Sequence, residues 1–305
     1  MLVRRGPRGP NGGTVAQGGD SSARAVGELV LVATPIGNLG DLSPRALDYL
    51  VSADVVYCED TRHSRTLFSA HGRSPKGRLV ALHEHNEASL CDEVVARVAS
   101  GQVVALVTDA GTPGISDPGA RVVRAVAVAG LRVTTAPGPS AVVAALTISG
   151  LATERFVMEG FLGRKAGERQ AHYRQWANEP RTIVFYESPQ RLATTLDELA
   201  GHFAGRQVAV AREITKVHEE VVRGTVRDVA DAFARRDVLG EIVVVLEGAL
   251  DAAPVDEDLV RTALRVELAS GASIRDAVTS VVDTLGVAHR ATYEIALQLR
   301  ADAGS

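Results

Sequence analysis

The stretch Val103-Val-Ala-Leu-Val-Thr108, followed at once by Asp109-Ala-Gly-Thr-Pro-Gly-Ile-Ser-Asp-Pro-Gly119, decides the fold. An unbroken apolar run of this length is typical of a strand that is buried on both faces of a parallel sheet. The glycines and prolines that follow end the strand, and Pro118-Gly119 leads into a helical pattern that Gly130 closes. A strand, a glycine-rich turn and a helix in this order form the repeating unit of an α/β fold.

Two more apolar runs end in the same kind of turn. Leu29–Ala33 is followed by Thr34-Pro-Ile-Gly-Asn-Leu-Gly-Asp41, and Leu131–Thr135 is followed by Pro137-Gly-Pro-Ser140. Open parallel sheets bind ligands at the carboxyl ends of their strands, and glycine lets backbone amides and carbonyls approach a ligand. A single turn of this kind is more often only a tight turn, but three at successive strand ends favour ligand binding.

Composition divides the 305 residues into four segments. Residues 1–26 are rich in Gly, Arg and Ser without periodicity, which predicts a disordered tail. Residues 27–138 alternate strands with helices and predict an α/β domain with a largely parallel sheet, and residues 139–250 predict a second, strand-rich α/β domain. Residues 251–305, which begin within an acidic linker (249–257), predict a small helical domain, either helix-turn-helix-like or a plain cap on the second domain.

Individual elements follow from periodicity and from turn residues. Strands beyond those already named are expected at Val55–Cys58, Phe156–Phe161, Thr182–Tyr186, Gln207–Ala211, Val221–Val226 and Glu241–Leu246. Helices are expected at Ser43–Ser52, Leu90–Ser100, Pro118–Ala129, Ser140–Ile148, from Ser188 onward, Asp258–Ala269, Ser273–Leu285 and Ala288–Arg300.

The bulk composition excludes several classes of protein. A hydrophobic fraction of 46% with 23% charged residues is ordinary for a protein with a well-formed core. No apolar run approaches the roughly 20 residues of a membrane helix, and no secretory signal is expected at the N-terminus. The two cysteines, Cys58 and Cys91, form no C-x-x-C pair, so a reducing, cytoplasmic location is expected.

The net charge of −4 does not indicate a nucleic-acid binder, but the positive charges are clustered. No acidic residue lies between Thr61 and His83, a segment that holds Arg62, Arg65, Arg73, Lys76 and Arg78. A second basic stretch, Arg164–Arg174, lies beside the aromatic residues Tyr173 and Trp176. Either stretch alone is most simply a solvated surface. Together they favour an anionic macromolecular partner.

Neither the dinucleotide fingerprint G-x-G-x-x-G nor the phosphate-binding motif G-x-x-x-x-G-K-[ST] occurs in the turns. A dehydrogenase or a P-loop nucleotidase is therefore disfavoured. His83 and His85 with Glu84 and Glu87 are a weak metal pattern without a cysteine or a third histidine, so no metal is expected.

Between Leu29 and Gly248 the chain carries an ordered set of motifs: Ala33–Leu42, Glu59–His63, His83–Glu87, Thr108–Pro113, Ser116–Gly119, Pro137–Ser140, Phe185–Ser188, Arg212–Lys216 and Gly240-Glu241. This set resembles the tetrapyrrole methylase superfamily, and within it the ribosomal small-subunit RNA 2′-O-ribose cytidine methyltransferase I family. The segments Glu59–His63 and His83–Glu87 indicate the RNA branch rather than the corrin and siroheme branches.

The resemblance implies a two-domain tetrapyrrole-methylase-like fold with S-adenosyl-L-methionine bound between the domains, and a homodimer. The substrate that it implies is 16S rRNA in the small ribosomal subunit, methylated on the ribose of a cytidine in the decoding region. The residues implied to line the donor site are Pro35, Asp109, Ala110, Gly111, Thr112, Ile115, Ser140, Ala141, Tyr186, Glu187 and Ile214.

Methyl transfer to a 2′-hydroxyl needs alignment and removal of the hydroxyl proton, because the donor carries its own positively charged leaving group. Candidate catalytic residues are Glu59, Asp60 and Lys216: burial can raise the pKa of a carboxyl, and a neighbouring cation such as Arg212 can lower that of a lysine. For Asp60, an ion pair with Arg62 that holds the loop is an equal alternative.

RNA contacts are expected from the basic segment that begins at Thr61. The candidate residues are Arg62, His63, Arg65, Arg73, Lys76 and Arg78. Tyr173 or Trp176 is a candidate for stacking on a base, whereas Met158 and Phe161 are expected in the core.

Two other functions remain open at this point. One is a methylase of the same superfamily that acts on a tetrapyrrole or another small substrate. The other is a ribosome-assembly factor that keeps the fold without catalysis. The Arg62–Arg78 segment argues against the first, and the intact glycine-rich turns argue against the second.

Overall fold

The computed structural model describes residues 27–249, 257–285, 287 and 289–302. The predicted tail (1–26) and almost all of the predicted linker lie outside these residues. The described chain divides into two compact units. The first holds residues 27–32, Pro44–Asp109 and Pro113–Pro137, and the second holds the remainder. Among the described residues, no helix has the length and apolar character needed to span a membrane.

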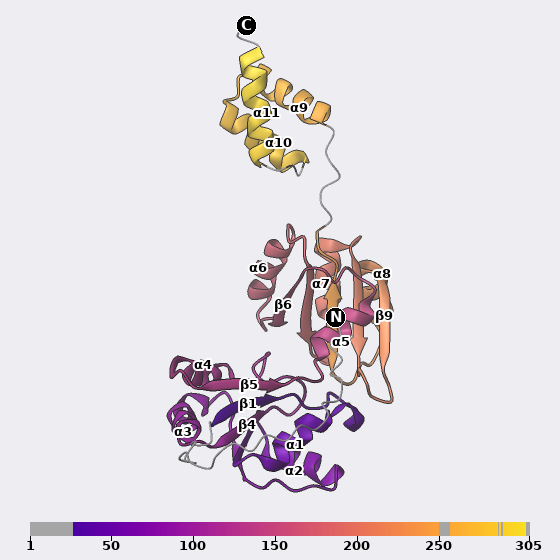
Figure 1. Ribbon diagram of the computed structural model, residues 1–305. Helices are drawn as coiled ribbons and strands as arrows, with labels where there is room; N and C mark the ends of the chain where they lie inside the picture. The colour runs from indigo at the N-terminus through magenta and orange to yellow at the C-terminus, as the bar shows by residue number, and fades with distance from the viewer. Residues whose placement is uncertain (1–26, 250–256, 286, 288, 303–305) are drawn as a thin grey trace, which may run out of the picture. The chain divides into compact units, whose positions relative to one another are not determined.

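The first unit is built on a five-stranded, entirely parallel sheet (Figure 1). Its strand order is β3-β2-β4-β1-β5. The strands are β1 (Glu28–Val32), β2 (Val55–Cys58), β3 (Arg78–Ala81), β4 (Val103–Val107) and β5 (Arg132–Ala136). Every residue of β2 is buried, as expected for a strand that is covered on both faces. The parallel α/β sheet predicted from the apolar runs is confirmed.

Four helices connect these strands: α1 (Pro44–Ser52), α2 (Thr61–Ala70), α3 (Glu87–Ala99) and α4 (Ala120–Val128). Helices α3 and α4 pack against each other. Val94 and Val98 of α3 and Val122 of α4 join Tyr57 and Leu106 in one buried cluster. Spacings of three and four residues place such side chains on one helix face, which explains why the helices lie on the sheet.

The sheet of the second unit is mixed and has the order β6-β7-β10-β8-β9. The strands are β6 (Phe156–Phe161), β7 (Thr182–Glu187), β8 (Gln207–Arg212), β9 (Glu220–Thr225) and β10 (Ile242–Leu246). Only β6 and β7 are parallel, and the other neighbours are antiparallel.

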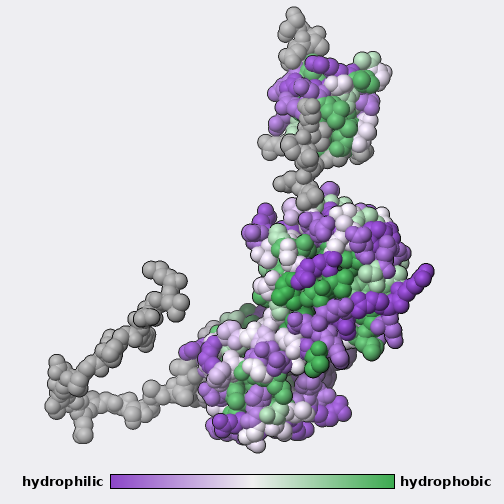
Figure 2. Space-filling view, turned by 90° about the vertical axis from the view of Figure 1, so that its right-hand side faces the viewer, coloured by the Kyte–Doolittle hydropathy of each residue, from purple (hydrophilic) through white to green (hydrophobic). Residues whose placement is uncertain are grey.

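Successive residues of these strands belong to two different cores, because side chains alternate between the faces of a sheet. Ile183 and Phe185 of β7 belong to the larger core, together with residues of α6 (Ala166–Trp176), α7 (Pro189–Phe203) and α8 (Val226–Phe233). Val184 belongs to the smaller core, where α5 (Ala141–Ser149) covers the opposite face. The space-filling view shows apolar side chains gathered at the surface of the second unit (Figure 2).

The chain ends in three helices with a core of their own. They are α9 (Glu257–Ala269), α10 (Ile274–Leu285) and α11 (His289–Asp302), and each packs against the other two. Leu264, Val278 and Leu299 are among the buried residues of this core, and all residues of the cluster come from the helices and their connections.

Candidate active site

Backbone hydrogen bonds bring the three glycine- and proline-rich turns together. The amide of Thr34 donates to the carbonyl of Gly111 over 2.9 Å, and the amide of Gly111 donates back to Thr34 over 3.1 Å. The hydroxyl of Thr112 donates to the carbonyl of Pro139 over 3.0 Å. Residues that are far apart in the sequence are therefore joined through their backbones, and residues 33–43 and 110–112 belong to the second unit with Pro139. Between β1 and α1, the first of these turns also forms the short 3-10 helix η1 (Leu39–Asp41).

Two glycines in these turns have steric reasons to be glycine. Gly111 has a φ of 86°, which side-chain-bearing residues rarely adopt. A Cβ atom added to Gly138 would lie 3.1 Å from the Cβ of Ala33, tighter than ordinary contact. The turns thus present bare backbone, which fits a ligand such as S-adenosyl-L-methionine that is recognised through backbone amides and carbonyls.

Beside the turns lies an apolar wall. Ile36, which follows the predicted donor residue Pro35, packs in one cluster with Ala141, Tyr186 and Ile214. Three donor-site residues predicted from the resemblance are therefore brought together by α5, β7 and the segment after β8. Ser140 precedes α5 and makes no side-chain cap on it. Ile115 is 47% exposed and belongs to the first unit.

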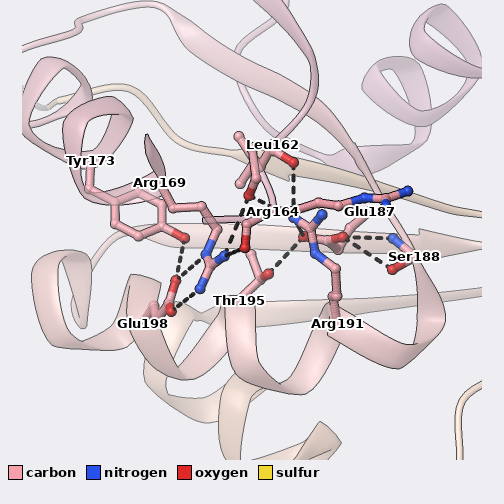
Figure 3. A network of polar contacts seen from close by, with 10 residues as sticks. Leu162, Arg164, Arg169, Tyr173, Glu187, Ser188, Arg191, Thr195 and Glu198 are labelled. Carbon is pink, nitrogen blue, oxygen red and sulfur yellow. Dashed lines mark hydrogen bonds and ion pairs between the residues drawn. The ribbon is translucent and has the colours of Figure 1, made fainter. Parts of the chain in front are cut away.

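Glu187 ends β7 and is only 3% exposed. Its carboxylate accepts hydrogen bonds from the amide of Ser188 over 2.8 Å and from the hydroxyl of Thr195 over 2.7 Å (Figure 3). It also forms an ion pair of 3.1 Å with Arg191. The carboxylate is therefore engaged by its own unit, and its proposed contribution to the donor site is to hold the end of β7 beside Tyr186.

Three carboxylates of the first unit interact at the ends of neighbouring strands. Glu59 follows β2, and Asp109 follows β4, its hydrogen-bonded neighbour. The side chain of Asp109 accepts the amide hydrogen of Asp60 over 3.2 Å. Burial and then the charge of Asp109 raise the pKa of Glu59. Burial, followed by the charges of Glu59 and Asp109, raises the pKa of Asp117 to about 6.

The sequence prediction missed Asp117 as a functional candidate. It lies in the stretch Ser116–Gly119 that carries the resemblance, but nothing in one sequence distinguishes it from a turn-forming aspartate. Ser116, its neighbour, has a φ of 60°, an unusual value for a residue with a side chain. The turn is thus held in an uncommon conformation beside a carboxyl group with a perturbed pKa, a combination typical of functional sites.

Asp60 caps α2 rather than standing free. Its carboxylate accepts the amide hydrogen of Arg62 over 2.7 Å and pairs with the Arg62 guanidinium over 2.9 Å. These bonds lower the pKa of Asp60 to about 2, so it remains ionised and is a weak base. The geometry matches the loop-holding ion pair more closely than a proton-accepting role.

Lys216 lies between two carboxylates, at 2.7 Å from Glu213 and 3.2 Å from Glu241. Burial alone would lower its pKa, but the hydrogen bonds to Glu213 and Glu241 outweigh burial and raise it. Lys216 is therefore a cation at neutral pH. A Cβ atom added to Gly37 would lie 2.4 Å from its Cγ, so the turn after β1 packs directly on this lysine.

The six predicted RNA-binding residues occupy the exposed surface of α2 and the segment through β3. Arg62, His63 and Arg65 lie on the outer side of α2, and Ser64 and Phe68 are buried on its inner side. The others, Arg73, Lys76 and Arg78, are also exposed. Lys76 forms an ion pair of 3.0 Å with Asp54, which neutralises part of the positive charge.

The aromatic residues of the second basic stretch are not available to RNA. Tyr173 and Trp176 are 0% and 1% exposed and belong to the larger core of the second unit. Their stacking on a base, proposed from the sequence, is wrong, because α6 turns both rings onto the sheet. The expectation that Phe161 lies in the core is also wrong, since its side chain is 63% exposed.

Glu87 binds the end of the donor turn, the segment Asp109–Gly119 that follows β4. It is 5% exposed, and one of its carboxylate oxygens accepts amide hydrogens from Gly119, Arg121 and Val122 at 2.7–3.3 Å. A carboxylate at the start of α4 also opposes the positive end of the helix dipole. Glu87 lies in the His83–Glu87 motif, and its role as an acceptor for these amides was not predicted from the sequence.

Comparison with known proteins gives a consistent result. Residues 28–230 match the family model described as Tetrapyrrole (Corrin/Porphyrin) Methylases. A Synechocystis protein named Ribosomal RNA small subunit methyltransferase I is 42% identical over 91% of this chain and 100% of its own length. The protein of the same name from Mycobacterium tuberculosis is 44% identical, covering 91% and 97%. That from Xylella fastidiosa is 48% identical, covering 74% and 83%.

Solved structures agree on the fold. A diphthine synthase superposes with a TM-score of 0.53 at 15% identity, covering 72% of this chain and 90% of its own. A cobalt precorrin-4 methyltransferase superposes with a TM-score of 0.51 at 20% identity, covering 72% and 94%. With the family match and the full-length relatives, these findings place the chain in the tetrapyrrole methylase family, in its ribosomal RNA small subunit methyltransferase I branch.

Proposed function

We propose that this protein transfers a methyl group from S-adenosyl-L-methionine to the ribose 2′-hydroxyl of a cytidine in the decoding region of 16S rRNA. The observation that carries the proposal is the match with relatives named Ribosomal RNA small subunit methyltransferase I, which extends over 91% of the chain. The intact glycine-rich turns support a working donor site rather than a fold that has lost catalysis.

S-adenosyl-L-methionine would supply a methyl group on a positively charged sulfur. The methyl carbon is therefore an electrophile that the ribose hydroxyl oxygen can attack directly. The chain has to hold this donor and align it. The backbone of residues 110–112 would contact the donor, with Pro35, Ser140 and Ala141 beside it. Tyr186, Glu187 and Ile214 are the further proposed donor residues of the second unit, and Asp109 and Ile115 are those of the first unit.

The chain must also take the proton of the attacking hydroxyl. Of the three predicted catalytic residues, Glu59 fits a proton acceptor best, since its pKa is raised and that of Asp60 is lowered to about 2. We add Asp117, whose pKa of about 6 lies near working pH. Lys216, as a cation, would hold the Glu213–Glu241 pair and the turn around Gly37 in place.

Substrate recognition would come from the exposed cations between Arg62 and Arg78. Arg65 and Arg73 are exposed, and RNA is held largely through the contacts of such cations with phosphates. A compact ribosomal subunit, which is bound over a wide surface, accounts for RNA binding by a chain whose net charge is −4.

A methyl-transfer assay with radiolabelled donor tests the activity. Label is expected in 16S rRNA of small subunits that lack the modification, and the position is identified by mapping the ribose that loses its methyl group when the gene is deleted. Label that enters a porphyrinoid but never ribosomal RNA would favour a small-substrate methylase. Calorimetry without donor binding would favour an assembly factor.

The RNA surface is tested by the double variant Arg62→Ala/Arg65→Ala. We expect unchanged donor affinity and a KM for small subunits that is raised about tenfold or more, as expected when two phosphate contacts are lost. Arg121→Ala/Arg124→Ala is the matched control, because it removes two exposed arginines with the same spacing from α4. Equal activity of both double variants would contradict the proposed surface.

A homodimer and a cytoplasmic location belong to the same proposal. The apolar area on the surface of the second unit supports an interface between two copies (Figure 2). Analytical ultracentrifugation measures the association directly, and a protein that sediments as a monomer at micromolar concentration would contradict the dimer.

A further inference from the structure

Phe161 is an aromatic residue held out from the end of a strand. It is the last residue of β6, at the edge of the second sheet, and its side chain is 63% exposed. The pairing of β6 with β7 shifts between Met158 and Phe161, and Gly160 has a φ of 71°. An irregularity of this kind redirects the next side chain. Here it turns Phe161 outward.

The exposed ring is supported from one side. Phe161 and Tyr186 lie with their ring centroids 5.1 Å apart at an interplanar angle of 39°. They are also partners in the register of the parallel strands β6 and β7, so both lie at the carboxyl ends of these strands. Tyr186 is a proposed donor-site residue. Phe161 therefore presents a free aromatic face next to the place where the donor is proposed to bind.

The segment that follows Phe161 is fixed by two arginines (Figure 3). Arg191 donates to the carbonyl of Leu162 over 3.1 Å, and Arg169 donates to the carbonyl of Arg164 over 2.8 Å. Figure 3 shows both guanidinium groups reaching across from their helices to this segment.

Each of these arginines is itself held by a carboxylate. Arg191 pairs with Glu187 over 3.1 Å, and Arg169 pairs with Glu198 over 2.6 Å. The hydroxyl of Tyr173 donates a further hydrogen bond to Glu198 over 2.9 Å. Ion pairs with little exposure hold a fixed geometry, because separating them would leave a charge without a partner. The backbone of residues 162–164 is consequently held in one position.

Two exposed cations lie at the end of this held segment and directly after it. Arg164 and Lys165 both extend from the surface, and the Lys165 side chain is 85% exposed, with Glu168 at 3.7 Å as a loose partner. An aromatic face and two cations within five residues match the two parts of a nucleotide. Bases stack on aromatic rings, and phosphates bind cations.

We propose that Phe161, Arg164 and Lys165 bind one unpaired nucleotide segment of the RNA substrate. Phe161 would stack on a base, and Arg164 and Lys165 would bind the adjoining phosphates. Arg169 and Arg191 are positioning residues that fix this site. The inference rests on the proposed RNA substrate and adds a contact surface on the second unit to the Arg62–Arg78 segment on the first.

The first test removes only the ring. Phe161→Leu is expected to raise the KM for unmethylated small subunits about 5- to 100-fold, the range for loss of one base–aromatic stack. The affinity for S-adenosyl-L-methionine, measured by calorimetry, should not change, and Phe161→Trp should restore the KM. Phe156→Leu is the matched control, because Phe156 is exposed at the other end of the same strand. An unchanged KM for Phe161→Leu overturns the inference.

The second test removes the cations and uses binding alone. Arg164→Gln/Lys165→Gln should weaken binding of a short oligocytidylate and lower the slope of log affinity against log salt by about 1.4, as expected for two phosphate contacts to a single strand. Arg174 is an exposed arginine of α6, and Arg174→Gln is the control. It should change the slope by less than the roughly 0.7 expected for the loss of one phosphate contact. An unchanged slope in the double variant contradicts the phosphate contacts.

The positioning role has its own readout. Arg169→Lys keeps the charge beside Glu198 but loses the planar group that binds a carboxylate and two carbonyls together. We expect a raised KM for small subunits with unchanged kcat and donor affinity. A fall in kcat with unchanged KM would overturn the role.

The two proposals fail in different ways. Wild-type protein that methylates no RNA would overturn the proposed function, and the oligocytidylate binding would still decide the inference. If the wild type methylates RNA and the Phe161→Leu variant does so equally well, only the inference about Phe161 is overturned.

Discussion

At the residue scale, the carboxylates of the first unit have the most unusual chemistry. Glu59, Asp109 and Asp117 repel one another in a partly buried place, and both Glu59 and Asp117 have raised pKa values. Like charges that are kept close lower stability unless one of them takes up a proton. A protein retains such an arrangement where a proton acceptor is useful, as in a site that has to deprotonate a hydroxyl.

The pKa of Asp117 leads to a prediction about stability and pH. The group titrates near 3.8 when unfolded and near 6 when folded. Between these values the unfolded chain releases the proton and the folded chain keeps it, so stability falls as the pH rises to about 6. Asp117→Asn should therefore raise the free energy of unfolding by about 1–3 kcal/mol above pH 7, with the gain vanishing below pH 4.

Urea unfolding at a series of pH values measures this difference. Asp92→Asn, at an exposed position on α3, is the matched control for the loss of one carboxylate. A gain for Asp117→Asn that does not depend on pH would mean that the carboxyl of Asp117 is not perturbed. Activity is measured separately, because the same change removes a proposed proton acceptor.

Glu87 gives a second residue-scale prediction. Glu87→Ala leaves three amide hydrogens at the start of α4 without an acceptor, which should cost about 1–3 kcal/mol of the free energy of unfolding. Donor affinity should also fall, since Gly119 ends the donor turn. Glu84→Ala, in the same motif but exposed, should change neither quantity. Loss of donor affinity with no loss of stability would indicate that Glu87 contacts the donor.

At the scale of elements, α6 illustrates what periodicity can miss. The second basic stretch (Arg164–Arg174) continues into this helix, and Arg169, Tyr173 and Trp176 are buried on one side of it. Two aromatics and an arginine at this spacing look like an RNA surface when the fold is unknown. The face of α6 that is buried is decided by its partners on the sheet and on α7. Among them are Glu159, which accepts a hydrogen bond from Trp176, and Glu198, which accepts one from Tyr173.

The orientation of α6 predicts a large stability loss for Trp176→Leu. Removing most of a fully buried indole should cost about 3–4 kcal/mol. Tyr173→Phe, which removes only the hydroxyl bonded to Glu198, should cost about 1 kcal/mol. Thermal and urea unfolding measure both. A Trp176→Leu protein as stable as the wild type would contradict the packing of Trp176 in the core of the second unit.

A feature of this fold could be predicted from the sequence when the residues that determine it are neighbours in the chain. Strands such as β2 and β4, and turns with glycine and proline, were predictable because their apolar runs and backbone demands are local. β3 was not predicted, since its four residues include exposed arginine and alanine and no buried position. Asp117 and the outward turn of Phe161 depend on neighbours from other strands, which one sequence does not reveal.

At the scale of the whole molecule, the described core of α9, α10 and α11 is separate from the cores of the two sheets. A set of helices that buries its own apolar residues can fold without the rest of the chain. The proposed donor and RNA residues all lie before Ala249. The C-terminal helices are therefore expected to be dispensable for the fold and for donor binding.

A chain truncated after Ala249 tests this independence. Its unfolding transition should coincide with that of residues 27–249 in the full protein, and its calorimetric affinity for S-adenosyl-L-methionine should agree within about twofold. The full chain should show an additional transition for residues 257–302, because units with separate cores unfold separately. The two transitions should be separate because Leu264, Val278 and Leu299 have their contacts within the three helices.

Val278→Asp in the full chain, which places a charge in that core, should abolish only the additional transition. If the truncated chain aggregates or loses donor affinity, the helices stabilise the second sheet, and the separate cores are not separate folding units.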